Sequence, residues 1–384
     1  MIRELTAKLR ERIPENVIHE ARKFAPLLAF AGGFTWDSLT LTRVDSLLDN
    51  AILLSYLLLL GLSIVLMYLT VERMEEEAFN QAGPVEEAAE RQPLIKRLSG
   101  WYPSLIQFFM GGLFSSYVVF YFHSASMSKT LVFVLLLFGL LVANEFMKDS
   151  LRNINLTMGL YFFVSFAFFT FSIPVVTKYF GFATFFASGI ISLALVAAIC
   201  FFLLKRQVLR GRRHMWALIA QTLVILIVLN ALYKLNWIPP VPLSVKQAGI
   251  YHNVERTGDN YSLSRVKPRW YRFWQTSDTL FLMREGDKAY CFSSVFAPSE
   301  LNTDIYHHWS FYDTKKNRWT ETDRISLSIT GGRYKGWRTY TRKSHIRPGR
   351  WKVDIRTEEG QMLGQISFRV VKADRELRFI TDNI

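Results

Sequence analysis

The sequence predicts a polytopic α-helical membrane bundle followed by an all-β, immunoglobulin-like antiparallel sandwich. Apolar residues are concentrated before residue 236, in runs of about 20, which is the length a helix needs to cross a bilayer. Beyond that point the apolar spacing changes from helical to alternating, which is typical of strands. Half of all residues are hydrophobic and 20% are charged, a balance that excludes a disordered chain.

Residues 1–23 are polar and basic, with Ile2, Leu5, Leu9 and Ile13 at helical spacing. This pattern favours an amphipathic helix lying on the cytoplasmic membrane surface over an ordinary solvated helix. A secretory signal peptide is not predicted, because the segment lacks a central apolar stretch and a small-residue cleavage site.

The membrane domain is predicted over residues 24–236, and its spans lie near 24–42, 46–70, 104–124, 127–147, 155–176, 180–204 and 215–235. The first span carries two adjacent glycines and Asp37, and its assignment rests on loop charge. With a cytoplasmic N-terminus, seven crossings place 17 Lys and Arg residues inside and 2 outside. Because basic residues are enriched in cytoplasmic loops, the C-terminal part is predicted to be periplasmic and the protein to reside in a bacterial inner membrane.

Residues 237–275 are predicted to be a linker and lead-in, beginning with the proline-rich IPPVPL, and residues 276–384 to form the sandwich. Trp351, Val353 and Ile355 alternate with Arg350, Lys352 and Arg356, so the first set is expected in the core and the second in water. Strands of this kind are expected near 279–284, 289–296, 305–312, 325–330, 333–343, 350–357 and 362–371. This number of strands suits an immunoglobulin-like sandwich.

Catalytic and metal-binding motifs are not found in the sequence. It has no phosphate-binding glycine loop, no nucleophile elbow and no HExxH, and its two cysteines stand in no metal-ligand spacing. His307 and His308 are neighbours in one predicted strand, so they face opposite sides and do not chelate one ion together. We therefore expect no cofactor, no metal and no assigned catalytic residue, and the sequence favours a non-enzymatic role.

Four polar residues are candidates near the outer membrane face: Asp37, Asp45, Asp49 and His123. Ionisable groups at bilayer depth usually face a bundle interior or an aqueous cavity, and this favours a transporter or membrane-embedded enzyme that uses Asp37, Asp49 and His123. The alternative is structural: Asp45 and Asp49 cap and solvate a helix start, while His123 extends to lipid headgroups. Asp37 is predicted to lie deepest.

A basic stretch over residues 333–352 contains no acidic residue. We expect Arg338, Arg342, Arg350 and Lys352 to contact anions and Trp337 to stack on a ligand. By alternation, Arg350, Lys352, Arg356 and Arg369 share one cationic surface, although a solvated sheet face would have the same pattern. Anionic envelope lipid or polysaccharide fits both the charge and the predicted compartment, whereas nucleic acid fits only the charge.

Several stretches are familiar from a known family: IPPVPLSVKQAGIYHNVER, VFAPSELNTDIYHHWSFYD and SLSITGGRYKGWRTYTRKSHIRPGRWKVDIRTEEGQMLGQISFRV. They resemble the bacterial domain-of-unknown-function family 2914, and AGGFTWDSLTLTRVDSLLDN is similar to the membrane half of family 5924. The resemblance covers most of residues 24–372 and implies a bacterial inner-membrane protein, but it supplies no activity.

The sequence thus predicts a membrane protein that presents a basic periplasmic sandwich to an anionic envelope component or a partner protein. Besides the transporter or membrane enzyme, a second alternative is a scaffold subunit that docks other membrane proteins through small-residue helix faces. Membrane lipids are expected partners in each case.

Overall fold

The computed structural model describes residues 32, 34–39, 41, 44–80, 101–125, 128–209, 211–268, 270–272, 275–298, 301–333, 335–374 and 377–384. Two compact units are distinguished, Met1–Arg43 and Val44–Ile384. In the first unit residues 34–39 are helical, and the rest of the predicted 24–42 span lies mostly outside the described residues.

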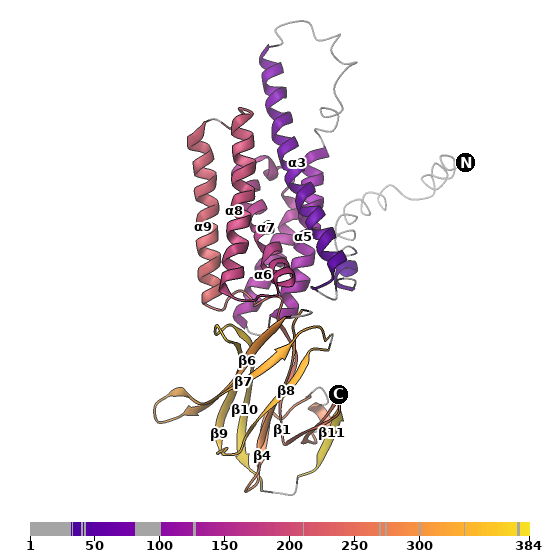
Figure 1. Ribbon diagram of the computed structural model, residues 1–384, viewed down its shortest axis with the longest axis vertical. Helices are drawn as coiled ribbons and strands as arrows, with labels where there is room; N and C mark the ends of the chain where they lie inside the picture. The colour runs from indigo at the N-terminus through magenta and orange to yellow at the C-terminus, as the bar shows by residue number, and fades with distance from the viewer. Residues whose placement is uncertain are drawn as a thin grey trace, which may run out of the picture. The chain divides into compact units, whose positions relative to one another are not determined.

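The N-terminal half of the second unit is helical (Figure 1). Its elements are α3 (Leu47–Asn80), α5 (Tyr102–Ser124), α6 (Ser128–Phe146), a 3-10 turn η3 (Ser150–Arg152), α7 (Ile154–Thr177), α8 (Phe182–Lys205) and α9 (Arg212–Lys234). Five helices in the described residues, α3, α5, α7, α8 and α9, are long and apolar enough to cross a membrane. The apolar part of α6, Thr130–Phe146, is shorter. These helices indicate a membrane protein.

Helix boundaries follow local chemistry. The side chain of Asn153 accepts a hydrogen bond of 3.0 Å from the backbone N–H of Asn155 and so caps α7. Pro103 occupies the first turn of α5, where its missing N–H costs nothing. Helix α7 ends at Lys178, whose φ of 61° is left-handed and stops the helix.

The helices pack closely where small residues face neighbouring helices. α7 is the most buried of the five long helices, and it contacts α3, α5, α8 and α9. On α8, Ser188, Gly189 and Ser192 are buried, and a Cβ atom at Gly189 would lie 2.1 Å from a methyl group of Leu226 on α9. Outward positions of α8 and α9 carry exposed isoleucine, phenylalanine, leucine and valine, as lipid-facing helices do.

The C-terminal half is all β, with strands β1 (Ser244–Tyr251), β2 (Asn253–Thr257), β3 (Asn260–Val266), β4 (Leu280–Met283), β5 (Ala289–Phe296), β6 (Asn302–Asp313), β7 (Arg318–Thr330), β8 (Trp337–Lys343), β9 (Gly349–Thr357), β10 (Met362–Lys372) and β11 (Phe379–Asn383). A 3-10 turn, η4 (Trp270–Arg272), lies between β3 and β4. The β region therefore begins at Ser244, inside the predicted linker, and not at residue 276.

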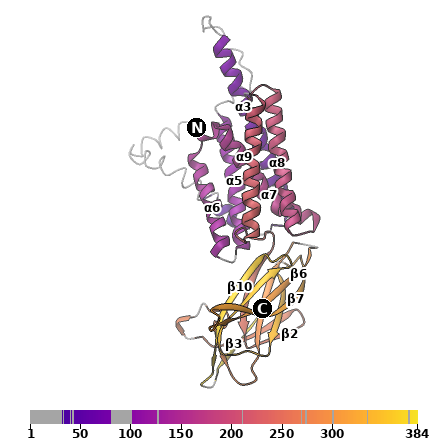
Figure 2. The ribbon, with the colours of Figure 1, turned by 90° about the vertical axis from the view of Figure 1, so that its left-hand side faces the viewer.

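Three sheets are formed, with strand orders β4-β10-β9-β6-β7, β1-β5-β8 and β11-β3-β2. β6 and β7 pair along almost their whole length (Figure 2). The strands pair antiparallel, as predicted, and the exception among the described pairs is β4 with β10, which is parallel.

The five-stranded sheet packs on the β1-β5-β8 sheet. Phe281, Trp309, Trp351 and Phe368 from the larger sheet pack with Ile250, Ala289 and Cys291 from the smaller one. A separate apolar cluster, which contains Tyr251, Leu263 and Phe292, joins the smaller sheet to β2 and β3. The result is a two-sheet sandwich with a third sheet packed against it.

The turn between β9 and β10 is hydrogen-bonded to helix ends. Gln361 Nε2 donates to the carbonyl oxygen of Tyr233 at 3.1 Å, and the backbone N–H of Met362 donates to Asn236 Oδ1 at 2.9 Å. Glu359 Oε2 accepts from the first N–H of α8, at Phe182, over 2.6 Å. A carboxylate at this position is favoured by the positive end of the helix dipole.

Candidate functional site

Alternation along β9 separates its core side chains from its outer ones. Trp351, Val353 and Ile355 are buried among the core residues, as predicted. Arg350, Lys352, Asp354 and Arg356 therefore project from the opposite face of the five-stranded sheet. Arg324 on β7 and Arg369 on β10 occupy the same outer face by register. We call Arg324, Arg350, Lys352, Arg356 and Arg369 the cationic face.

Strand register places two arginines directly opposite each other. Arg350 on β9 pairs with Arg369 on β10, one position away from the core pair Trp351 and Phe368. Neither arginine forms an ion pair with another residue in the described part of the chain. Like charges at directly opposed positions are destabilising, and a bound anion would reduce this repulsion.

Aromatic rings from the β6–β7 hairpin border the arginine pair. The guanidinium carbon of Arg350 lies 4.2 Å from the ring centroid of Tyr312 and 5.7 Å from that of Trp319. Nζ of Lys352 lies 5.3 Å from the Trp319 centroid. The two rings meet edge to face at 5.2 Å, and Trp319 remains 36% exposed. These cation–π contacts orient the charged groups and leave an aromatic surface open to a ligand.

Asp354 holds part of the cationic face in place. It is only 1% exposed and accepts hydrogen bonds from Lys352 Nζ at 3.0 Å, Arg356 Nη2 at 2.8 Å and Gln365 Nε2 at 2.7 Å. Burial alone would raise the pKa of Asp354, but the hydrogen bonds from Gln365, Arg356 and Lys352 outweigh it and hold that pKa below its usual value. The carboxylate is therefore ionised and anchors two of the cations.

The five residues expected to bind a ligand are divided between two sheets. Arg350 and Lys352 belong to the cationic face, whereas Arg338, Arg342 and Trp337 lie on β8 in the three-stranded sheet. Arg338 Nη1 donates to main-chain oxygens of Asp259 and Ile384, at 3.0 and 3.1 Å.

The other two β8 residues differ in exposure. Trp337 is partly buried against the core, and Arg333 lies over its ring at 4.5 Å. Arg342 is exposed. Consecutive strands of the basic stretch thus enter different sheets, and the binding of a ligand by these five residues stays a prediction.

Two of the polar candidates near the membrane face lie at helix ends. Asp49 lies in the first turn of α3 and His123 in the last turn of α5, where it is exposed. In the described part of the chain no hydrogen bond or ion pair joins these two residues. Asp37, which is half-buried, belongs to the separate N-terminal unit.

The start of α3 is capped by a serine. Ser46 Oγ accepts from the backbone N–H of Asp49 at 3.3 Å, a role that the sequence had suggested for Asp45. Asp45 itself lies in the turn just before the helix. Among the described residues, no group of three or more His, Cys, Asp or Glu side chains is placed to hold a metal ion.

Two buried histidines have partners that the sequence does not reveal. His307 is fully buried on β6, with Nε2 2.9 Å from Ser293 Oγ and Nδ1 2.9 Å from Thr341 Oγ1. Burial, with a smaller contribution from neighbouring His308, lowers the pKa of His307 to about 3. His308 faces the other side and contacts Glu321, as alternation predicts. His307 is thus a neutral link between the two sheets of the sandwich.

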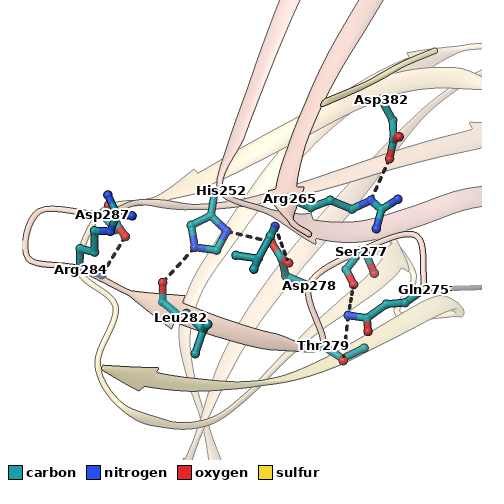
Figure 3. A network of polar contacts seen from close by, with 11 residues as sticks. His252, Arg265, Gln275, Ser277, Asp278, Thr279, Leu282, Arg284, Asp287 and Asp382 are labelled. Carbon is teal, nitrogen blue, oxygen red and sulfur yellow. Dashed lines mark hydrogen bonds and ion pairs between the residues drawn. The ribbon is translucent and has the colours of Figure 1, made fainter. Parts of the chain in front are cut away.

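His252 pairs with Asp278, a contact the sequence did not suggest (Figure 3). Nδ1 of His252 lies 2.8 Å from Asp278 Oδ2, and its Nε2 lies 3.0 Å from the carbonyl oxygen of Leu282. Because a carbonyl only accepts, Nε2 carries a proton. Burial raises the pKa of Asp278, against the opposing hydrogen bond and charge of His252. No local pattern could have shown this pair, because its members are 26 residues apart.

Comparison with known proteins finds a match to one family model within the C-terminal half. Residues 302–370 match the model of a family described as a protein of unknown function, DUF2914. The resemblance noted for the C-terminal residues is thereby supported, whereas that of the membrane half to family 5924 stays a prediction. No curated protein matches the sequence.

Three solved structures illustrate the range of structural matches. An immunoglobulin-like protein from Pseudomonas aeruginosa, 11% identical, aligns over 34% of this chain and 98% of its own, with a TM-score of 0.21. A β-glucosidase from Kluyveromyces marxianus, 9% identical, aligns over 37% of this chain and 15% of its own, with a TM-score of 0.17. The alkylpurine DNA glycosylase AlkC of Pseudomonas fluorescens, 12% identical, aligns over 86% and 99%, with a TM-score of 0.19.

Proposed function

We propose that this protein is a bacterial inner-membrane protein whose β region faces the periplasm and binds an anionic envelope component through the cationic face. The apolar helices support the membrane assignment, and the excess of basic residues in alternate loops supports the orientation. The β region from residue 241 to 384 carries 25 Lys and Arg against 16 Asp and Glu, which favours an anionic ligand. The immunoglobulin-like assignment of the sandwich belongs to the same proposal.

The observation that carries the proposal is the opposed pair of Arg350 and Arg369. The two arginines are directly opposite each other on adjacent strands, and a guanidinium group can donate two parallel N–H bonds to a phosphate or carboxylate. The rings of Tyr312 and Trp319 hold Arg350 from one side, so less side-chain freedom is lost on binding.

Binding is tested with the full-length protein in phosphatidylcholine nanodiscs and inorganic pyrophosphate as the probe, by calorimetry at two salt concentrations. Replacing both arginines, Arg350→Ala with Arg369→Ala, is expected to weaken binding at least tenfold, since two charge-assisted contacts of about 1.5–3 kcal/mol each are lost. The matched control is Arg342→Ala, which removes an exposed arginine from β8.

Affinity should fall with added salt in the unsubstituted protein and in the control. Equal weakening by the control, or unchanged binding in the double variant, would refute the assignment of the site.

The orientation is tested separately with reporters fused after Ile384. Alkaline phosphatase, which needs an oxidising compartment, is expected to be active there, and a cytosolic fluorescent reporter to be dark. The opposite result would place the cationic face in the cytosol, where an envelope component cannot reach it, and would refute the proposal. A transporter or membrane enzyme that uses Asp37, Asp49 and His123 is the alternative, and among the described residues no hydrogen bond or ion pair joins Asp49 to His123.

A further inference from the structure

A cavity of about 400 Å³ lies beside β4 and β10, at one end of the five-stranded sheet. Leu280, Leu282 and Val371 contribute apolar walls, and the exposed residues Lys267, Lys372 and Asp374 also line the cavity. The connection from β3 to β4, through Pro268 and Tyr271, forms the opposite wall. Cavities that hold small molecules in proteins typically have volumes of about 300–1,000 Å³, so this one is large enough for a ligand.

The cavity opens on the same side of the sheet as the cationic face. In the parallel pairing of β4 with β10, Val370 lies opposite Phe281, and both point into the core. Their neighbours Leu280, Leu282, Arg369 and Val371 therefore project from the outer face. Leu280 is directly opposite Arg369, so the apolar wall begins one strand away from the arginine pair.

A buried, hydrogen-bonded pair of side chains, His252 and Asp278, contributes to the wall of the cavity, and Figure 3 shows its contacts. Asp278, which lines the cavity, is 2% exposed and is held by His252 on one oxygen and by the backbone N–H of Val266 on the other. The His252 ring stacks on Phe281 at 4.0 Å with an interplanar angle of 6°. These contacts keep the wall in place without a ligand, as a preformed site requires.

We propose that the ligand of the cationic face is an anionic amphiphile, whose phosphate or carboxylate head binds Arg350 and Arg369 and whose hydrocarbon part enters the cavity beside Leu280. The inference rests on the proposed function and specifies its substrate class. Two features support it: the positive charge beside the cavity complements the head, and the exposed leucine and valine side chains complement the tail. A purely polar polymer would leave these apolar walls in water.

The distances along the sheet suit a short chain. Arg350 on β9 and Leu280 on β4 are two strand spacings apart, or about 10 Å. An alkyl chain of about six carbons attached to a phosphate on the arginines therefore reaches the cavity. Each methylene buried there contributes up to about fourfold in affinity, from about 0.8 kcal/mol per methylene.

The test compares methyl phosphate with hexyl phosphate on the full-length protein in phosphatidylcholine nanodiscs. Hexyl phosphate is expected to bind at least tenfold more tightly. In Leu280→Gln this advantage should fall to less than threefold, while the affinity for methyl phosphate stays unchanged. Leu280 is 43% exposed, so the substitution is compatible with folding. The matched control is Tyr340→Gln on β8, which is 37% exposed and should keep the advantage.

The outcomes separate this inference from the proposed function. Binding of methyl phosphate that needs Arg350 and Arg369 but gains nothing from the hexyl chain would overturn the amphiphile and leave the anion site standing. If hexyl phosphate still bound more tightly than methyl phosphate in both Leu280→Gln and Val371→Thr, the amphiphile proposal would also be overturned, because the hexyl chain would then lie outside the cavity. If neither methyl phosphate nor hexyl phosphate binds, both the anion site and the amphiphile proposal are refuted.

Discussion

Each face of the five-stranded sheet contains a buried titratable side chain. The side chain is neutral on the inner face and charged on the outer face. On the inner face, His307 is surrounded by the hydroxyls of Ser293 and Thr341 and stays neutral. On the outer face, Asp354 is almost as inaccessible but accepts from Lys352 and Arg356 and stays charged. A buried charge persists only where a partner compensates its lost hydration. The buried group of the outer face is therefore charged, and that of the inner face is neutral.

The largest expected effect is the acid sensitivity of the inner face. Because the folded pKa of His307 is about 3, below the unfolded value of about 6.5, the unfolded chain binds an extra proton between these values. Stability is thus fully present above pH 6.5 and is lost as pH falls, at up to about 1.4 kcal/mol per pH unit.

The acid effect is measured by thermal unfolding of the full-length protein in detergent, followed by tryptophan fluorescence. Between pH 6.5 and 5, where carboxylates scarcely titrate, His307→Gln should flatten the dependence of the melting temperature on pH. An equal slope in the two proteins would show that His307 is not held neutral.

On the outer face, Asp354→Asn should lower the free energy of unfolding by about 2–3 kcal/mol at pH 7, because two cations lose a charged acceptor. The folded pKa of Asp354 is depressed, so its contribution is present above the unfolded value of about 3.9 and disappears as pH falls through the folded pKa. Melting curves should therefore differ between the two proteins at pH 7, and the difference should shrink as pH falls below about 3.9. Ser367→Ala, a change of an exposed polar residue on the same face, is the control.

The smallest expected effect contrasts the arginines of β8 with those of the outer face. Arg338→Ala should destabilise the β region by about 1–2 kcal/mol, since its guanidinium donates to two main-chain oxygens. Arg369→Ala should change the stability of the ligand-free protein by less than about 0.5 kcal/mol, because it removes a like-charge neighbour. Pyrophosphate binding should show the reverse order. If Arg338→Ala weakened pyrophosphate binding more than Arg369→Ala did, the assignment of the anion site to the outer face of the five-stranded sheet would be wrong.

Features that depend on local sequence patterns could be predicted from the sequence. Of the seven spans that the long apolar runs predicted, six coincide with described helices, and five of these are long and apolar enough to cross a membrane. Alternation correctly placed Trp351 inside and Arg350 and Lys352 outside. β2 and β3 were missed, although Val254, Tyr261 and Leu263 are buried on either side of a two-residue turn with Gly258 at a φ of 64°. In β1 a register shift between Val245 and Gln247 interrupts the alternation that would have revealed the strand.

Features that depend on strand order could not be predicted from the sequence. Arg338 and Arg350 are twelve positions apart in one basic stretch, yet long-range pairing assigns β8 to β5 and β9 to β6 and β10. The contact of His252 with Asp278, and the cavity next to it, likewise require strands that are distant in sequence to meet. Alternation gives the face on which a side chain lies but does not identify its neighbours across the sheet.

The last strand of the five-stranded sheet, β7, ends the strand order with 13 residues, and such an open edge invites pairing with another chain. Arg318, Glu321 and Arg324 are exposed along it, and its partner β6 is irregular between Trp309 and Ser310. Charges and an irregular ladder both oppose the addition of a foreign strand. Copies crowded together in a membrane are thereby protected from edge-to-edge aggregation.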